Sequence, residues 1–242
     1  MPFGPAECGY DAASMTTGPD EAPPIRFELR RGAITALPLA VAVGLFGVSF
    51  GVLSATTGGM GALPAVVMSA TTFAGSAQFA AASILAGGGQ PIAAVAAALL
   101  LNARYLPIGI SVASVLGGGP LRRFLKAQLV IDESWAIAAR GGGEFVAGRL
   151  IGAGIVMWLV WVGGTVVGVI GGEALGDPSA LGLDAAFPAL FLALLASQLA
   201  DRGAVSAALL GAGIAVALTP FTPPGVPIIA ASAAALIGLL ER

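Results

Sequence analysis

Long runs of apolar residues constrain this chain more than any other feature of its sequence. Residues 33–57 and 150–172 contain no charged side chain, and each run exceeds the roughly 20 residues that a helix needs to cross a bilayer. Charged residues make up 10% of the chain, against about 25% in soluble domains. The runs do not alternate polar and apolar residues, as strands of a membrane β-barrel would. We therefore expect an all-α, polytopic membrane helical bundle.

The composition also restricts the chemistry. The chain has no histidine and one cysteine, Cys8, so histidine metal ligands and an intramolecular disulfide are both excluded. A net charge of −2 argues against a nucleic-acid partner. No nucleotide-binding loop, metal-ligand cluster or nucleophile–base pair is present. We expect no cofactor, no metal and no enzymatic activity.

The N-terminal residues differ from the rest of the chain. Residues 1–29 are rich in polar residues, Gly and Pro, and we expect a disordered tail before a single transmembrane domain, 30–242. The tail lacks the basic start and apolar stretch of a signal peptide. The first apolar run is therefore expected to be an uncleaved membrane segment.

Basic residues predict how the runs cross the membrane. They gather before the first run (Arg26, Arg30, Arg31) and after the third (Arg122, Arg123, Lys126), and such residues favour the cytoplasmic side. Two segments expected in the cytoplasm are then separated by three runs, 33–57, 62–86 and 91–117. An odd number of crossings cannot begin and end on the same side of the membrane. One run must enter and turn back, or cross twice. The alternative is that the N-terminus lies outside and the charge rule is violated once.

Two runs carry polar motifs where lipid-facing residues would be expected. FAGSAQ (73–78) interrupts the second run, and one regular helix would place Gln78 opposite the other polar residues. A break near Gly75 and Ser76 removes this conflict and frees backbone groups to bind a solute. The alternative is that Ser76 and Gln78 only bond neighbouring helices together.

NARYLP (102–107) interrupts the third run. An arginine at membrane depth costs about 2.5–3.5 kcal/mol even on the lenient insertion scale, which makes Arg104 a functional candidate. With Asn102 beside it, its guanidinium could hold a substrate carboxylate. The alternative is an internal ion pair with Asp132 or Asp184.

Residues 121–138 contain two adjacent acids. Taken as one helix, this segment places Glu133 with Arg122 and Lys126, as a solvated partner. Asp132 falls instead among aliphatic and aromatic groups, where an acid suits reversible protonation and hence proton coupling. The alternative is that Asp132 caps a following helix.

Two repeated patterns concern the fold. Glycines recur at GxxxG-type spacing at positions 44, 47 and 51 and again at 164, 168 and 172, which predicts close helix contact within the chain or with a partner. A proline near the start of an apolar helix recurs in 35–47 and 185–197, at Pro38 and Pro188. This second pattern is a weak indication of an inverted repeat.

Four motifs, in order, carry a resemblance to a known family. They are FGVSFG (46–51), FAGSAQFAA (73–81), NARYLPIGIS (102–111) and IDESWAIA (131–138). They resemble the AzlC family, the large subunit of branched-chain amino acid exporters, over about residues 30–240. The aromatic–Ala–Gly–Ser–Ala–Gln block is the most specific of them.

The resemblance implies a secondary transporter in the plasma membrane that exports branched-chain or related neutral amino acids. The basic residues before the first run predict that its N-terminus lies in the cytoplasm. The resemblance also implies a small membrane partner of the AzlD type. The expected substrate-binding residues are Gly75, Ser76, Gln78, Asn102 and Arg104, with Asp132 for proton coupling. Two alternatives remain, a channel for a small neutral solute and a membrane assembly subunit that does not transport.

Overall fold

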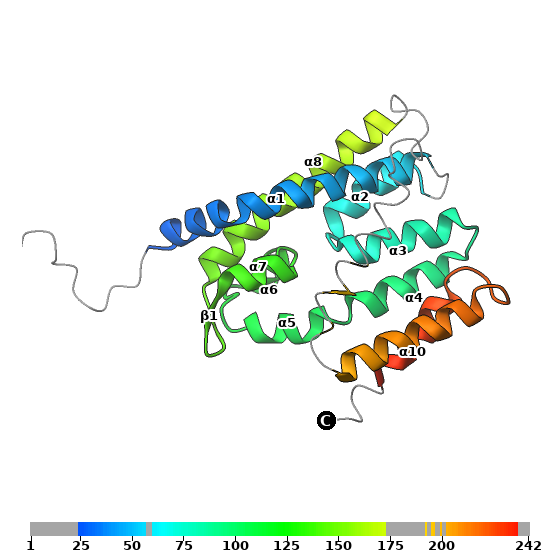
Figure 1. Cartoon of the computed structure of the whole chain (residues 1–242). Helices are drawn as coiled ribbons and strands as arrows, with labels where there is room; N and C mark the ends of the chain where they lie inside the picture. The colour runs from blue at the N-terminus through cyan, green and yellow to red at the C-terminus, as the bar shows by residue number, and fades with distance from the viewer. Residues whose placement is uncertain are drawn as a thin grey trace, which may run out of the picture.

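The chain folds as an all-α bundle, as its apolar runs predict (Figure 1). The computed structural model describes residues 24–56, 60–172 and 202–236, together with residues 192, 195, 196 and 199. Its helices are α1 (Ile25–Thr56), α2 (Ala62–Thr71), α3 (Gly75–Ala86), α4 (Pro91–Asn102), α5 (Tyr105–Val112), α6 (Pro120–Ala127), α7 (Asp132–Ala138), α8 (Ala147–Gly172), α10 (Arg202–Leu218), α11 (Val226–Ser232) and the 3-10 helix η3 (Ala233–Leu236). The strands described are β1 (Ala139–Gly141) and β2 (Glu144–Phe145), which pair antiparallel.

Helices α1 and α8 form the central pair of the bundle and run in the same direction. Gly152 lies against the Leu29 backbone near the start of both helices, and Gly168 lies against Val48 further along. A Cβ atom on Gly168 would stand 2.1 Å from the carbonyl oxygen of Val48. The glycine repeats therefore make a close helix contact within this chain, one of the two outcomes they predicted. The shared direction agrees with the charge pattern.

A buried acid joins the first turns of the pair. Glu28, on α1, is 4% exposed and forms ion pairs with Arg149 of α8 and with Arg140, 3.5 Å away. Helix α1 begins at Ile25, inside the residues that the sequence assigned to the tail. Residues 1–23 lie outside the described part of the chain.

The second apolar run is a re-entrant hairpin. Helix α2 passes back along α8, with Ser69 Oγ 2.8 Å from Thr165 Oγ1 and Trp158 Nε1 donating to the Ala70 carbonyl at 3.0 Å. After a break at residues 72–74, α3 returns to the side of the molecule where α1 ends (Figure 1). The predicted entering and returning segment is thus 62–86.

The break in this hairpin differs from the expected one in its details. It lies just before Gly75, and the left-handed backbone angle falls on Phe73, with φ 43°. Gly75 is instead the first residue of α3, where a Cβ would lie 3.1 Å from the Trp161 ring. The close approach of an aromatic ring, rather than backbone strain, therefore favours glycine at this position.

The third run is a bent crossing. Helices α4 and α5 meet at residues 103–104 with a bend of 46°. Among the described residues, α1 and α8 are long and apolar enough to span a membrane, and the bent pair makes a third candidate. If the bent pair is one span, the returning hairpin and this crossing together meet the parity requirement of the charge pattern.

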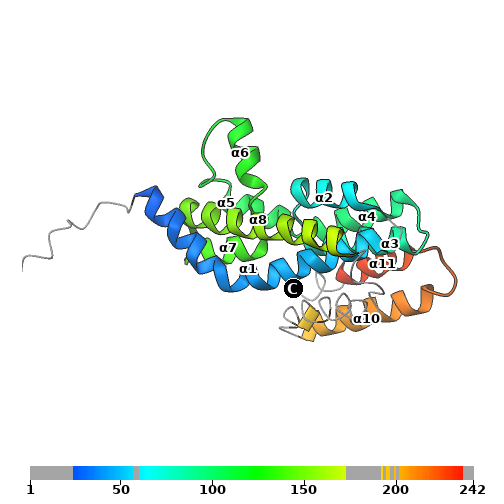
Figure 2. The same ribbon diagram turned by 90° about the horizontal axis from the view of Figure 1, so that it is seen from above.

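The expectation of a single helix over 121–138 is wrong. Helix α6 ends at Ala127, and α7 starts at Asp132 after a short connection. Because the two helices are separate, the face assignment that set Glu133 beside Arg122 and Lys126 does not hold. Helix α6 has no buried residue, carries two arginines and a lysine, and projects from the bundle (Figure 2).

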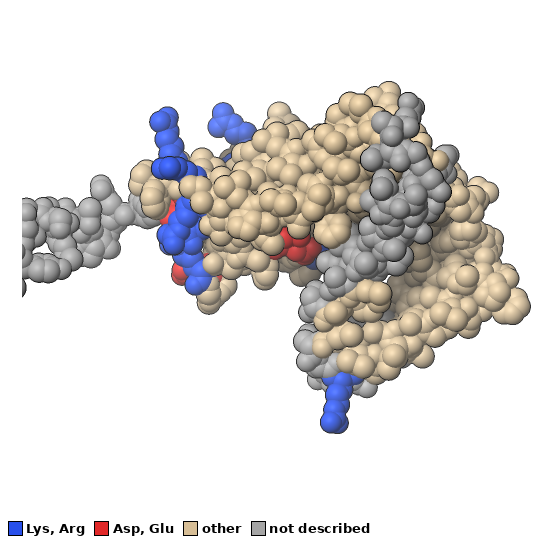
Figure 3. All heavy atoms as spheres, turned by 45° about the horizontal axis from the view of Figure 1, so that its top comes forward, with Lys and Arg blue, Asp and Glu red and all other residues tan. Residues whose placement is uncertain are grey.

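Charge is distributed unevenly over the surface. Figure 3 shows most of the basic side chains of one face near the end where α1 begins, a separate basic side chain at the lower edge, and a small acidic patch midway along the molecule. Most of the remaining described surface of this face carries neither sign of charge, as expected for helices that face lipid. The expected helix 187–200, Asp184 and the Pro188 copy of the repeat lie outside the continuously described residues.

The glycine contact between α1 and α8 predicts a sharp difference between two alanine substitutions in α8. Gly168→Ala forces a Cβ into the Val48 carbonyl and should destabilise the fold by about 1–3 kcal/mol through overpacking. Gly163→Ala is the matched control, because no atom lies within 4 Å of its added Cβ. Thermal unfolding in detergent checks both variants. Equal unfolding temperatures for the two would contradict this packing.

Candidate functional site

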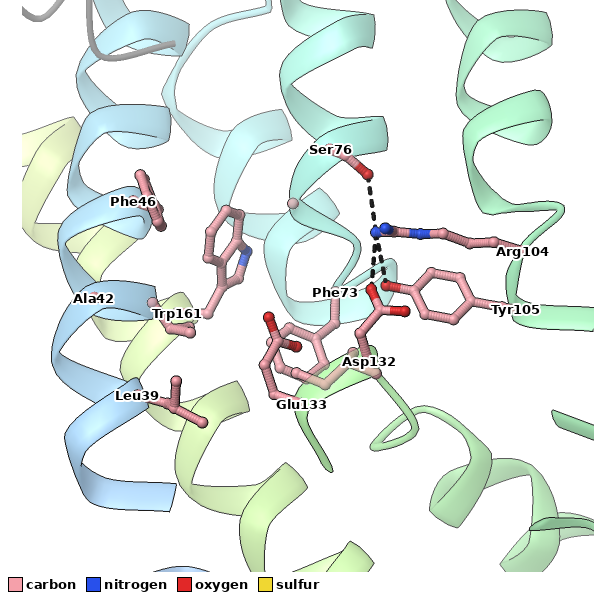
Figure 4. Close-up of a pocket in the computed structure, with 13 residues that line it drawn as sticks. Leu39, Ala42, Phe46, Phe73, Ser76, Arg104, Tyr105, Asp132, Glu133 and Trp161 are labelled. Atoms are coloured by element: carbon pink, nitrogen blue, oxygen red, sulfur yellow. Dashed lines mark hydrogen bonds and ion pairs between the residues drawn. The ribbon is translucent and has the colours of Figure 1, made fainter. Parts of the chain in front are cut away.

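The two helix breaks meet at one cavity (Figure 4). Ser76 follows the first break and Arg104 lies in the second, and their side chains are joined at 3.2 Å. A cavity of about 240 Å³ opens at this point, somewhat smaller than the roughly 300–1,000 Å³ typical of small-molecule sites. It is lined by Leu39, Ala42, Val43, Phe46, Phe73, Gly75, Ser76, Arg104, Tyr105, Ile131, Asp132, Glu133 and Trp161.

The cavity lies about halfway along the central helices. Trp161, which contacts the position of Gly75, is near the middle of α8 (Ala147–Gly172). Both breaks therefore fall near the middle of the span rather than at its ends. Non-helical backbone at such a depth is tolerated where it lines a cavity or is buried in protein.

Arg104 is the cation of the cavity. Its Nη2 atom lies 3.1 Å from Asp132 Oδ2 and donates to Ser76 Oγ, and the guanidinium lies over the Tyr105 ring at 5.2 Å. Figure 4 shows it reaching from the bend between α4 and α5 toward the start of α7. The internal ion pair with Asp132 that the sequence left as an alternative is thus present, and it lines the cavity.

Two acids from the first turn of α7 face this cation. Asp132 carries the ion pair, while Glu133 lies closer to the Trp161 side of the cavity (Figure 4). Helix α7 is outside the candidate membrane spans. Burial raises the pKa of the Glu133 carboxyl above its ordinary value, and the neighbouring Asp132 adds to this rise. The expectation that Glu133 is merely a solvated partner of bases is therefore wrong.

Gln78 lies outside the cavity lining, in a buried hydrogen-bond network that supports the break. Its Oε1 accepts from the Ala74 N–H at 3.1 Å, and its Nε2 donates to Ser69 Oγ at 3.0 Å. Ser69 in turn bonds Thr165, whose hydroxyl donates to the Trp161 carbonyl. The side chain is fully buried. It satisfies backbone freed by the break and ties the hairpin to α8.

Asn102 lies at the end of α4 and does not line the cavity. Its Oδ1 is buried and has no hydrogen-bond partner among the described residues. Of the expected binding residues, the structure therefore brings Gly75, Ser76 and Arg104 together with Asp132. Gln78 and Asn102 lie outside the cavity lining.

Sequence reasoning did not identify the apolar wall. Helix α1 contributes four side chains at helical spacing, Leu39, Ala42, Val43 and Phe46, a periodicity that can be found in the sequence. Trp161 closes the same side and stacks on Phe50, with ring centroids 6.0 Å apart. No local pattern distinguishes Trp161 from a packing residue, because its position depends on the contact between α1 and α8.

Two donors in the cavity lack acceptors. Trp161 Nε1 and Arg104 Nε are buried atoms without a hydrogen-bond partner among the described residues. A buried donor left unpaired costs about 1–3 kcal/mol. A cation, two carboxylates and unpaired donors on an apolar cavity are complementary to a small solute that carries both charges and an apolar group.

The chain is similar to proteins of one family. Residues 38–175, more than half of the chain and all of the cavity lining, match the family described as AzlC protein. The chain is 28% identical over 184 residues to the branched-chain amino acid transport protein AzlC of Bacillus subtilis, covering 75% of this chain and 72% of that protein. It is 28% identical over 216 residues to an uncharacterized membrane protein of Archaeoglobus fulgidus, covering 85% and 91%. No solved structure matches.

The Gln78 network predicts a loss of stability rather than a loss of solute contacts. Gln78→Leu leaves the buried Ala74 N–H without its acceptor and should lower the free energy of unfolding by about 1–3 kcal/mol. Gln90→Leu is the control, because Gln90 is exposed and makes no capping hydrogen bond. Thermal unfolding of both purified variants checks this. A Gln78→Leu protein with unchanged stability and impaired solute binding would contradict the structural role.

Proposed function

This chain belongs to the AzlC family, and we propose that it is a secondary transporter that exports branched-chain amino acids across the plasma membrane. The observation that supports this most directly is the charged and apolar cavity where two helix breaks meet near the middle of the bundle. Solute sites of secondary transporters are typically formed by discontinuous helices near the bilayer midplane. The name of the Bacillus subtilis relative supports the choice of solute.

The cavity offers a separate contact for each part of such a solute. Arg104 and the first turn of α3, at Gly75 and Ser76, take the carboxylate, because a helix N-terminus attracts anions. Asp132 takes the ammonium. The aliphatic side chain lies against the apolar wall that α1 contributes, near Phe46. Gln78 supports this arrangement through its hydrogen bonds to Ala74 and Ser69.

Proton coupling follows from competition at Asp132. In the empty cavity its carboxylate pairs with Arg104. A bound solute brings a carboxylate to Arg104 and an ammonium to Asp132. Each of these two residues then exchanges its partner in the ion pair for the opposite charge of the solute. A proton on Asp132 removes the negative charge that holds the ammonium. Solute and proton therefore exclude each other at this residue, as an exporter driven by entering protons requires.

We further propose that the chain works with a small membrane subunit of the AzlD type and that its N-terminus lies in the cytoplasm. The basic residues before the first span support this orientation. The exposed apolar surfaces of a bundle in lipid provide room for such a subunit. A transport role, rather than an enzymatic one, accounts for the cavity without a catalytic group.

Uptake of labelled leucine and valine into inverted vesicles tests the proposal. Export appears there as accumulation, and the full chain is compared with and without an AzlD-type subunit and a proton gradient. Saturable, gradient-dependent accumulation is expected. Transport that never saturates and ignores the gradient would favour a channel instead. Absence of transport with the partner bound would favour an assembly subunit.

Arg104→Ala should lower leucine accumulation by at least ten-fold, because the substrate carboxylate loses a charge-assisted contact of about 1.5–3 kcal/mol. Arg123→Ala is the matched control. Arg123 is an exposed arginine whose side chain donates to the Ala113 carbonyl, and it does not line the cavity. Normal leucine export by the Arg104→Ala protein would refute the assigned role.

Asp132→Asn should uncouple transport from the proton gradient, because an amide cannot carry the proton that the proposal assigns to this carboxylate. We expect this variant to show no gradient-driven accumulation of leucine. Glu144→Gln serves as the control, since Glu144 is an exposed acid of β2 outside this cavity. Gradient-driven accumulation by the Asp132→Asn protein at the wild-type level would exclude Asp132 as the coupling residue.

A further inference from the structure

The indole of Trp161 differs from the other two indoles of this chain. Trp135 Nε1 donates to Ser111 Oγ at 2.9 Å, and Trp158 Nε1 donates to the Ala70 carbonyl at 3.0 Å. Trp161 is 4% exposed, yet its Nε1 has no acceptor among the described residues. Buried indole N–H groups usually find a partner. The missing acceptor therefore needs an explanation.

The ring cannot readily turn to find an acceptor elsewhere. It stacks on Phe50 and meets Phe79 edge-on, with centroids 6.0 and 6.3 Å away. The ring also lies close to Gly75, where an added Cβ would stand 3.1 Å from it. Three contacts thus hold the indole in one orientation. In Figure 4 the nitrogen edge faces the cavity, on the side of Glu133, Asp132 and Arg104.

The start of α3 lies between this donor and Arg104. Gly75 touches the Trp161 ring, and the next residue, Ser76, accepts from Arg104. The N–H groups in the first turn of a helix have no acceptor within the helix. An indole N–H, a guanidinium and a helix N-terminus therefore surround one part of the cavity, and all of them donate. Such a set is suited to an anionic group with more than one oxygen.

We propose that the Trp161 N–H is a substrate-binding donor that takes one oxygen of the substrate carboxylate, while Arg104 takes the other. This inference rests on the proposed function, because it assumes a carboxylate-bearing amino acid as the solute. It adds a residue of α8 to a site otherwise formed by the two breaks and α7. It also gives the aromatic cluster a role, which is to hold the donor in place.

The role predicts selectivity for the carboxylate. With the purified full chain, Trp161→Phe should weaken leucine binding roughly 10- to 100-fold, the range for a hydrogen bond to a charged group. Binding of 3-methylbutylamine, which is leucine without its carboxylate, should change less than about two-fold, because it never engages the N–H. Competition against labelled leucine, and direct titration of the amine, measure both affinities.

Two further proteins make the test independent of folding. Trp135→Phe removes an indole N–H outside the cavity and should leave both affinities unchanged. Benzothienylalanine at position 161 keeps the shape of the ring and replaces the N–H with sulfur. It should reproduce the loss of leucine affinity even if Trp161→Phe is unstable.

The outcomes separate this inference from the proposed function. Leucine binding at the wild-type level by the benzothienylalanine protein would overturn the role of Trp161 and leave the transport proposal standing. Equal weakening of leucine and 3-methylbutylamine would overturn it as well, because a packing role does not distinguish the two. Absence of leucine binding by the wild-type chain would refute the proposed function and this inference together.

Discussion

The close parallel contact of α1 and α8 is the interaction on which the rest of the structure depends. In lipid, apolar surface alone gives no preference for one helix over another, so association depends on how closely two backbones approach. The glycines allow contacts that any Cβ would prevent, as at Gly168 against Val48. Once the two helices are fixed, Trp161 and Thr165 face the re-entrant hairpin. The apolar residues of α1 face the same cavity. The packing of this one helix pair thus positions both walls of the site, the one with Trp161 and the apolar one that α1 contributes.

A helix break near mid-membrane needs acceptors and donors for the backbone that it frees, and α8 and the hairpin provide them. Gln78 takes the Ala74 N–H, and Trp158 donates to the Ala70 carbonyl. Each of these side chains is anchored by α8 or belongs to it. A break at this depth without such partners would cost several kcal/mol for each unsatisfied group. The hairpin is therefore stable only where it packs against α8. Its polar residues accordingly form two sets, one that satisfies the backbone of the break and one that lines the cavity.

This division sets the limit of what sequence alone can predict. Charge parity and the polar motifs located both interruptions and required a broken or re-entrant segment within 62–117, because they depend on composition and counting along the chain. Periodicity failed at 121–138, where a helix pattern continued through a break that has no glycine and no proline inside it. Gln78 and Ser76 are two residues apart in one motif, yet one supports the break and the other lines the cavity. Only the packing against α8 distinguishes them, and that packing lies about 90 residues away, beyond any local pattern.

The Arg104–Asp132 pair connects the stability of the bundle with its proposed transport. An unpaired charge at this depth would be costly, and an ion pair reduces that cost as long as both partners stay together. A zwitterionic solute can replace the pair without leaving either group alone, since it offers an opposite charge to each. A solute with only one charge would leave one residue of the pair uncompensated. We therefore expect the site to bind simple anions and cations more weakly than zwitterions, by the same electrostatics that stabilises the ion pair. An unpaired indole N–H adds preference for the carboxylate end and so sets the direction in which the solute binds.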